Sequence, residues 1–415
     1  MAAHTPPETT GARVDALPTA DAVVCVPACG TAEAVRRAAD RVARAVARLS
    51  PPSTVVLLHP DTAVAADTGG AGTDRVAAVP LLPHRLSPMT RLPLAAADGV
   101  PPVHALAAVA SHAGARACCL VAARADDLTA DAVHALLRPV VELNFDLVLP
   151  IYARHRLDGL INSSIVHPLT RALYGRRADG QLGLDFAFSA RFVPALLEPT
   201  RQHGRPRAVW PVTEAVERGL QICQAHLGTW VAPVEESADA GSALSQVLGS
   251  LFLDVEHHAP VWQKVRGSQD VPAFGSAAPF DEEARDVDVG PMIESFQLGF
   301  RNLPDVWSRA LPPATLVELG RLARAPRAEF RVPDALWARI VYDFALGHRL
   351  RVINRDHLLR AFAPIYLAWV ASFVLDAGGI SRAAVGARLE RLCQAYEAEK
   401  PYLMSRWRWP DRFNP

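Results

Sequence analysis

The stretch that decides the fold spans residues 21–59 and reads DAVVCVPACGTAEAVRRAADRVARAVARLSPPSTVVLLH. It opens with a short, apolar, β-branched run that breaks at Pro27, and it closes with a second apolar run, STVVLLH. Between the two runs, residues 31–49 place alanine and valine on one helical face and arginine and aspartate on the other. Buried strands separated by an amphipathic helix are typical of a parallel sheet that helices cover on both faces.

The alternation of strand and helix continues through the first 150 residues. We expect a helix over 103–113, a strand over 117–122, an N-capped helix after Asp127 and a strand over 145–150. Residues 60–102 are rich in Gly, Asp, Pro and Ala and have little periodicity, which predicts a long loop. The pattern therefore predicts an α/β fold with a mostly parallel sheet.

Such sheets bind ligands at the carboxyl ends of their strands. Pro27, Asp61 and the pair Asp126–Asp127 follow three of the predicted strands, so a nucleotide site at this edge is the default hypothesis. The chain has neither GxGxxG nor GxxxxGK[ST], which leaves a Rossmann dinucleotide site and a P-loop without support. A loop-surface aspartate explains Asp61 equally well, and the N-cap of the following helix is an alternative for Asp127.

From about residue 295 onward the periodicity is helical, with predicted helices over 312–325, 333–348, 355–375 and 381–404. We therefore divide the chain into a disordered tail (1–20), an α/β domain (21–265), an acidic, Pro/Gly-rich linker (266–294) and a helical C-terminal region (295–415). The longest apolar run, residues 361–375, contains Pro364 and falls short of the roughly 20 residues that span a bilayer. We expect a buried helix there.

The composition describes a globular chain of 415 residues, 50% apolar and 21% charged. Lys+Arg and Asp+Glu are both 43, so no global field draws the chain to nucleic acid or to an anionic bilayer, and we exclude both as main partners. The six cysteines show no CxxC spacing, and the first 20 residues lack the features of a signal peptide. Both observations predict a soluble cytoplasmic protein with reduced thiols and no membrane span.

A block from Asp146 to Ser189 carries the most specific motifs and reads DLVLPIYARHRLDGLINSSIVHPLTRALYGRRADGQLGLDFAFS. Its distinctive residues are Pro150, Tyr152, Arg154, Asp158, Gly159, Ile161, Asn162, Pro168, Leu169, Arg171, Leu173, Gly175, Asp185 and Phe186. With these residues in this order, the chain resembles bacterial GT-A glycosyltransferases related to mannosylglycerate and glucosylglycerate synthases. The similarity continues in Trp210, Glu214 and the runs 219–228, 364–374 and 399–407, and so covers most of the chain.

The resemblance implies a GT-A-like, Rossmann-like fold and a site for a nucleotide-diphospho-sugar. Pro27, Asp61 and Asp126 would bind this donor. Asp127 corresponds to the family's metal-binding carboxylate and would hold Mg²⁺ or Mn²⁺ against the diphosphate.

The resemblance also implies an acceptor site. Asp185 would act as the catalytic residue by orienting or polarising the acceptor hydroxyl, and Arg154, Asp158 and Asn162 would bind an acceptor carboxylate. Structural alternatives remain open: Asp185 as a turn acid that caps backbone amides, and Arg154 with Asp158 as a local salt bridge.

Several polar positions of the family pattern are lost. Ala125 stands where the first carboxylate of the metal motif belongs, Ala208 replaces another acid, and Ala232 replaces a metal-binding histidine. We therefore expect weak metal binding with one protein ligand, Asp127, unless His104, His155 or His226 substitutes for the missing imidazole.

The sequence thus favours a glycosyltransferase-like protein that transfers a hexose from a nucleotide-diphospho-sugar to a small polar acceptor, carboxylated acceptors included. The alternative is a catalytically silent GT-A homologue that serves as a binding or scaffold protein; the three alanines favour it, whereas Asp127, Asp158 and Asp185 favour the enzyme. A third reading is a different sugar-nucleotide enzyme on the same fold. The apolar C-terminal run also suggests a homodimer contact.

Overall fold

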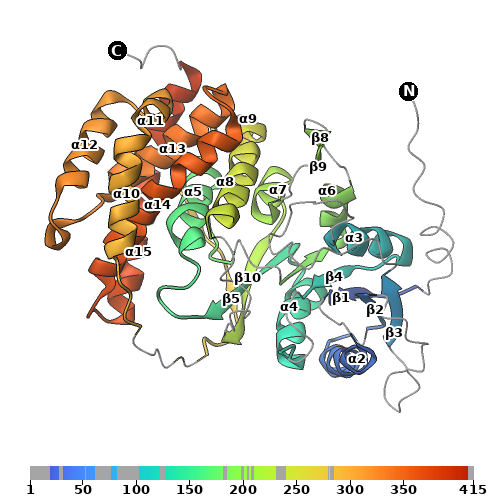
Figure 1. Cartoon of the computed structure of the whole chain (residues 1–415). Helices are drawn as coiled ribbons and strands as arrows, with labels where there is room; N and C mark the ends of the chain where they lie inside the picture. The colour runs from blue at the N-terminus through green and yellow to red at the C-terminus, as the bar shows by residue number, and fades with distance from the viewer. Residues whose placement is uncertain are drawn as a thin grey trace. The chain divides into compact units, whose positions relative to one another are not determined.

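The computed structural model describes residues 19–27, 31–51, 53–60, 76–81, 102–121, 127–180, 185–197, 201–202, 205–206, 210–229, 240–278, 280 and 285–409. The chain divides into two compact units. Unit 1 comprises Met1–Ala153, Ala178–Thr229 and Val271–Pro279, and unit 2 comprises Arg154–Arg177, Trp230–Asp270 and Phe280–Pro415 (Figure 1).

Unit 1 is built on an eight-stranded sheet with the strand order β12-β10-β5-β7-β4-β1-β2-β3. The strands are β1 (Ala22–Cys25), β2 (Val55–Pro60), β3 (Val76–Leu81), β4 (Ala117–Leu120), β5 (Leu147–Ala153), β7 (Phe186–Ser189), β10 (Ile222–Thr229) and β12 (Ala273–Phe274). Every neighbouring pair is parallel except the two that β7 makes, because β7 runs antiparallel to both β4 and β5.

Helices cover both faces of this sheet (Figure 1). The helices of unit 1 are α2 (Ala32–Val46), α3 (Pro102–Ala113), α4 (Ala130–Leu143), α6 (Val193–Leu197) and α7 (Pro211–Glu217). The apolar faces of α2 and α4 form one core with alternate strand residues such as Val24, Cys119 and Val148, while α3 packs on β1 and β4 and against α6. This arrangement confirms the predicted α/β class with a mostly parallel sheet.

Strands β3, β7, β10 and β12 of unit 1 are not among the strands predicted from the sequence. Strand β3 lies inside the stretch 60–102, for which the sequence predicts a long loop, and it pairs in parallel with β2. Its sequence, VAAVPL, contains Pro80, which cannot donate a ladder hydrogen bond. The strand tolerates this proline because it lies at the edge of the sheet.

The start of α4 also differs from the expectation. Its N-cap is Thr129, whose side chain accepts a hydrogen bond of 3.1 Å from the backbone N–H of Ala132. Asp127 lies two residues earlier and is exposed. The interpretation of Asp127 as the N-cap of this helix is therefore wrong.

Unit 2 is helical. Its main helices are α5 (His167–Tyr174), α8 (Ala240–His257), α9 (Ala259–Trp262), α10 (Gly290–Asn302), α11 (Pro304–Ala310), α12 (Pro313–Arg324), α13 (Asp334–Leu350), α14 (Arg355–Ala377) and α15 (Arg382–Arg408). A π-helix, Asn162–Val166, precedes α5, and the short strands β6 (Arg176–Arg177) and β11 (Gln269–Asp270) pair in parallel. The four helices predicted beyond residue 295 correspond to α12, α13, α14 and α15, so the helical C-terminal region is confirmed.

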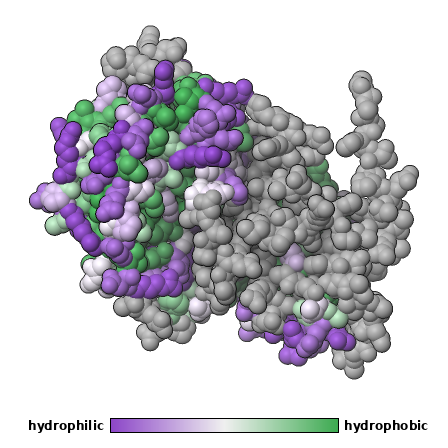
Figure 2. Space-filling view, in the orientation of Figure 1, coloured by the Kyte–Doolittle hydropathy of each residue, from purple (hydrophilic) through white to green (hydrophobic). Residues whose placement is uncertain are grey.

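Helix α14 carries the long apolar run. No residue of 361–375 is exposed, which confirms the predicted burial, and Trp369 stacks between Trp337 and Phe373 at ring distances of 5.7 and 5.1 Å. By length and composition alone α14 is able to cross a membrane, but 61% of its most apolar window is buried inside the protein. On the face seen in Figure 2, hydrophilic residues of unit 2 lie among hydrophobic ones.

The two units interleave along the chain. Residues 154–177 and 230–265 fall within the predicted α/β range of 21–265 but belong to unit 2, and residues 271–278 fall within the predicted linker but belong to unit 1. The sequence pattern changes from α/β to helical once along the chain, near residue 295. The chain itself passes between the two units several times.

A buried charge network ties α5 to α15 within unit 2. The guanidinium of Arg171 is buried and donates hydrogen bonds of 2.6 and 2.8 Å to Glu390 and of 2.9 Å to Glu397. Ser268 also donates to Glu397. The buried ammonium of Lys400 donates to the backbone oxygens of Ala172, Leu173 and Val265 at 2.8 to 3.1 Å. Arg171, a residue of the family-like block, is therefore committed to packing.

Replacing Arg171 by leucine removes the cation and leaves two carboxylates close to each other. We expect Arg171→Leu to lower the free energy of unfolding by about 2 kcal/mol, less than for a fully buried pair because Glu390 and Glu397 both reach solvent. Urea denaturation, followed by the fluorescence of buried tryptophans such as Trp337, measures this loss. Arg391→Leu is the control. It removes an exposed arginine of α15, the helix that carries Glu390 and Glu397, and should change little.

The same network sets a pH dependence. The hydrogen bonds from Arg171 lower the pKa of Glu390; burial opposes the shift in Glu397, but hydrogen bonds from Arg171 and Ser268 still hold its pKa below the usual value. Because both folded-state pKa values are depressed, this stability is present above the ordinary glutamate pKa of about 4.3 and is lost as the pH falls below it. The difference between wild type and Arg171→Leu should therefore shrink in acid, and a constant difference from pH 7 to pH 3.5 would contradict this account.

Candidate functional site

The carboxyl edge of the sheet of unit 1 gathers four of the residues singled out in the sequence. Pro27 follows β1 and is half-buried, Asp127 follows β4, and Tyr152 lies near the end of β5. Asp185 joins them because β7 is antiparallel, so its first residues lie beside the last residues of β4, with Leu120 opposite Phe186. The direction of one strand thus brings Asp185 to the edge where parallel sheets bind ligands.

The Asp185 carboxylate accepts a hydrogen bond from the hydroxyl of Tyr152. Asp185 is buried at 9% exposure, and its side chain is on the sheet face that α2 and α4 cover, as are those of Tyr152 and Cys119. Burial, and then the negative charge of Asp185, raise the pKa of Tyr152 far above its usual value, so the hydroxyl stays protonated and remains a donor.

Asp179 and Gly180, shortly before Asp185 in the chain, contact the sheet. The backbone of Gly180 approaches β5 so closely that a Cβ there would lie 1.9 Å from the carbonyl oxygen of Pro150. The backbone N–H of Asp179 donates a hydrogen bond of 2.7 Å to the side-chain oxygen of Gln224, a buried residue of β10. Close packing therefore requires glycine at position 180.

Asp127 stands at the start of the segment that leads into α4. Its side chain is exposed and has no hydrogen bond or ion pair with the residues that the structure describes. The next residue, Leu128, is buried in the same core as Cys119 and Ala187, which fixes the backbone of Asp127 against the α4-covered face of the sheet. The backbone at Asp127 is thus fixed, and its exposed carboxylate is accessible to a cation. Two further donor-site candidates, Asp61 and Asp126, lie outside the described residues.

The three acceptor-site candidates belong to unit 2. Asp158 accepts an ion-paired hydrogen bond of 2.6 Å from Arg285. Arg154 lies against Gly159, where a Cβ would come within 2.5 Å of its guanidinium, and its backbone oxygen accepts from Arg382 at 3.0 Å. Asn162 is buried at the start of the π-helix, and its backbone oxygen accepts from the N–H of His167.

The histidines considered as replacements for the missing imidazole lie in different places. His226 pairs with Ile151 at the carboxyl end of β10, and it points to the face opposite Tyr152 because side chains alternate along a strand. His104 is on α3, where burial lowers its pKa. His155 belongs to unit 2, and its Nδ1 accepts a hydrogen bond of 3.1 Å from the backbone N–H of Leu157.

Two features of the site were missed from the sequence. Tyr152 was noted as a motif residue but given no role, although the alternation in LVLPIYA places it on the same face as Val148. The close approach of Gly180 to Pro150 has no local signal in the sequence, since it is a contact between residues 30 positions apart.

Comparison with known proteins gives only distant likenesses. No family model matches the chain, and no curated protein matches it. Among solved structures, it is similar to glucosyl-3-phosphoglycerate synthase from Mycobacterium tuberculosis in complex with Mn²⁺, uridine diphosphate and glucosyl-3-phosphoglycerate, with 17% identity and a TM-score of 0.36 over 61% of this chain and 86% of that one.

Two further structures of that enzyme are similar, each at 17% identity over 60% of this chain and 85% of the other. One holds phosphoglyceric acid and has a TM-score of 0.32; the other holds Mg²⁺ and uridine diphosphate and has a TM-score of 0.34. The assignment of a function therefore depends on this chain's own residues.

Proposed function

We propose that the chain is a GT-A-like glycosyltransferase that transfers a hexose from a nucleotide-diphospho-sugar to a small polar acceptor, carboxylated acceptors included. The observation that carries the proposal is the buried Asp185 carboxylate, hydrogen-bonded to Tyr152, at the carboxyl edge of a mostly parallel sheet. The family-like motifs between Asp146 and Ser189, read from the sequence, support it further.

The donor half of the proposal uses Asp127. Its exposed carboxylate fits a single protein ligand to a divalent cation, Mg²⁺ or Mn²⁺, which when bound would offset charge on the departing diphosphate. With Ala125 in the first position of the motif, Asp127 would be the one carboxylate of this segment to hold the cation, so metal affinity and the stabilisation of the leaving group would both be weak.

The acceptor half uses Asp185. Tyr152 donates a hydrogen bond to the carboxylate, and a carboxylate is able to accept a further hydrogen bond from a substrate hydroxyl at the same edge of the sheet. A carboxylate in this position orients the hydroxyl and polarises its O–H bond as the new glycosidic bond forms. Arg154, Asp158 and Asn162 remain candidates for binding an acceptor carboxylate, although Asp158 already pairs with Arg285.

A second candidate function is a catalytically silent homologue that binds nucleotides or acts as a scaffold. The observation that favours it is the engagement of Asp185, since a buried carboxylate that accepts from a tyrosine hydroxyl is also a stable structural pair. The losses at Ala125, Ala208 and Ala232 point the same way.

Titration calorimetry of the chain with UDP, GDP and ADP, each with and without Mn²⁺ or Mg²⁺, tests the donor site. Asp127→Asn should abolish the metal-dependent part of nucleotide binding, because it removes the only carboxylate assigned to the cation. Asp126→Asn is the matched control and should keep most of it, since the family pattern places the metal-binding carboxylate at Asp127. Equal losses from the two substitutions would refute the role given to Asp127.

Transfer assays test the acceptor site, with UDP- and GDP-hexoses as donors and small hydroxy acids, phosphoglyceric acid among them, as acceptors. Asp185→Asn should lower the turnover number roughly 10²-fold while nucleotide binding persists, because only the polarisation of the acceptor is lost. Tyr152→Phe should cost less, since it removes the positioning hydroxyl and leaves the carboxylate. Unchanged turnover in Asp185→Asn would contradict its role, and nucleotide binding without any turnover in the wild type would favour the silent homologue.

A further inference from the structure

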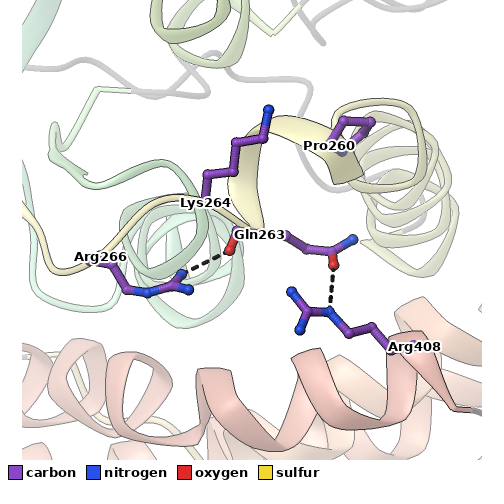
Figure 3. A pocket seen from close by; sticks show the side chains of 5 residues that line it. All are labelled: Pro260, Gln263, Lys264, Arg266 and Arg408. Carbon is purple, nitrogen blue, oxygen red and sulfur yellow. Dashed lines mark hydrogen bonds between the residues drawn. The ribbon is translucent and has the colours of Figure 1, made fainter.

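Unit 2 contains an open pocket of about 480 Å³ beside the C-terminal ends of α9 and α15. Its lining residues are Pro260, Gln263, Lys264, Arg266 and Arg408 (Figure 3). Three of the five are cations and none is an acid, in a chain whose total charge is zero. Another pocket of this unit contrasts with it, because its lining residues include the acid Glu294 beside Arg301.

Gln263 holds the two arginines of the pocket. Its backbone oxygen accepts a hydrogen bond of 2.8 Å from Arg266, and its side-chain oxygen accepts one of 3.0 Å from Nε of Arg408 (Figure 3). The two terminal nitrogens of Arg408 have no partner among the described residues, and neither does the ammonium group of Lys264. The terminal nitrogens of Arg408 and the ammonium of Lys264 are thus available as hydrogen-bond donors in the pocket.

The backbone that carries these cations is rigidly packed. Trp262, immediately before Gln263, donates to the backbone oxygen of Val255 at 2.9 Å and contacts Trp407 edge to face at 5.3 Å. Trp407, immediately before Arg408, is covered by the guanidinium of Arg349 at 4.3 Å. Both tryptophans are buried. The positions of Gln263 and Arg408 are therefore set before any ligand arrives, which lowers the entropy cost of binding.

Lys264, Arg266 and Arg408 make no ion pair with the residues that the structure describes. The ammonium of Lys400 donates a hydrogen bond to the backbone oxygen of Val265, which lies between Lys264 and Arg266. Burial, and then the charge of Arg266, lower the pKa of Lys400 to about 8. The opposing carboxylate, Glu397, is already taken by Arg171 and Ser268. Lys264 and Lys400 are also the only lysines of the chain. An anion in the pocket would relieve this repulsion between cations.

We propose that this pocket binds a small phosphorylated anion through Arg266 and Arg408, with Lys264 at the rim. The free terminal nitrogens of Arg408 form the fork that binds two phosphate oxygens at once. The volume fits a small molecule, and no aromatic side chain lines the pocket to stack a base, which argues against a nucleic acid. This site is separate from the proposed donor and acceptor residues and does not depend on the proposed function.

The test is calorimetric titration of the full chain with inorganic phosphate, pyrophosphate and glycerol phosphate, without divalent cations. Arg408→Gln and Arg266→Gln should each weaken binding about tenfold or more, because each removes charge-assisted hydrogen bonds. Arg408→Lys should lose part of the affinity, since it keeps the charge but not the fork. The preference among the three probes distinguishes a free phosphate ion from a phosphomonoester.

Two controls make the outcome specific. Arg321→Gln removes an exposed arginine from the last turn of α12, the position that Arg408 holds in α15, and should leave binding unchanged. Asp127→Asn should also leave it unchanged, which separates the pocket from the proposed donor site. The proposal is overturned if Arg408→Gln and Arg266→Gln bind the probes like the wild type, or if Arg321→Gln weakens binding as much as they do.

Discussion

Strand β7 runs against its neighbours β4 and β5, and this single reversal decides where the chemistry of unit 1 can lie. A parallel strand in its place would bring its first residue to the opposite edge of the sheet. As β7 is antiparallel, Asp185 instead meets the ends of β4 and β5, where Tyr152 is within reach of its carboxylate. The candidate site therefore depends on strand direction before it depends on any side chain.

The second constraint is the cost of burying the Asp185 carboxylate. An isolated charge in this position would be strongly unfavourable, and Tyr152 offsets part of that cost by donating a hydrogen bond. The pair therefore serves stability whether or not a substrate binds. In an enzyme the same pair would also position the carboxylate, so burial and hydrogen bonding are compatible with both functions and only turnover separates them.

Much of the fold could be predicted from the sequence, because buried strands and amphipathic helices have clear periods. The helix over α2 and the four C-terminal helices fall where their apolar residues recur. Strand β3 could not be predicted because Pro80 and its flanking residues are typical of a loop. The sequence alone does not decide between Asp127 and Thr129 as the N-cap of α4, because both residue types cap helices. The contacts of Gly180 and Tyr152, and the cations around Gln263, depend on tertiary packing that no local pattern encodes.

The family-like block itself mixes two kinds of residue. Arg171 binds two glutamates of α15, and Gly175 is left-handed, with a φ of +69°, and so close to the backbone of Gly267 that a Cβ would lie 2.8 Å from its oxygen. Packing alone explains both residues. Their presence therefore supports the fold and gives no information about catalytic activity. Asp127 differs, because its exposed carboxylate has no structural task among the described residues. The role of Asp127 is therefore a question of ligand binding and not of packing.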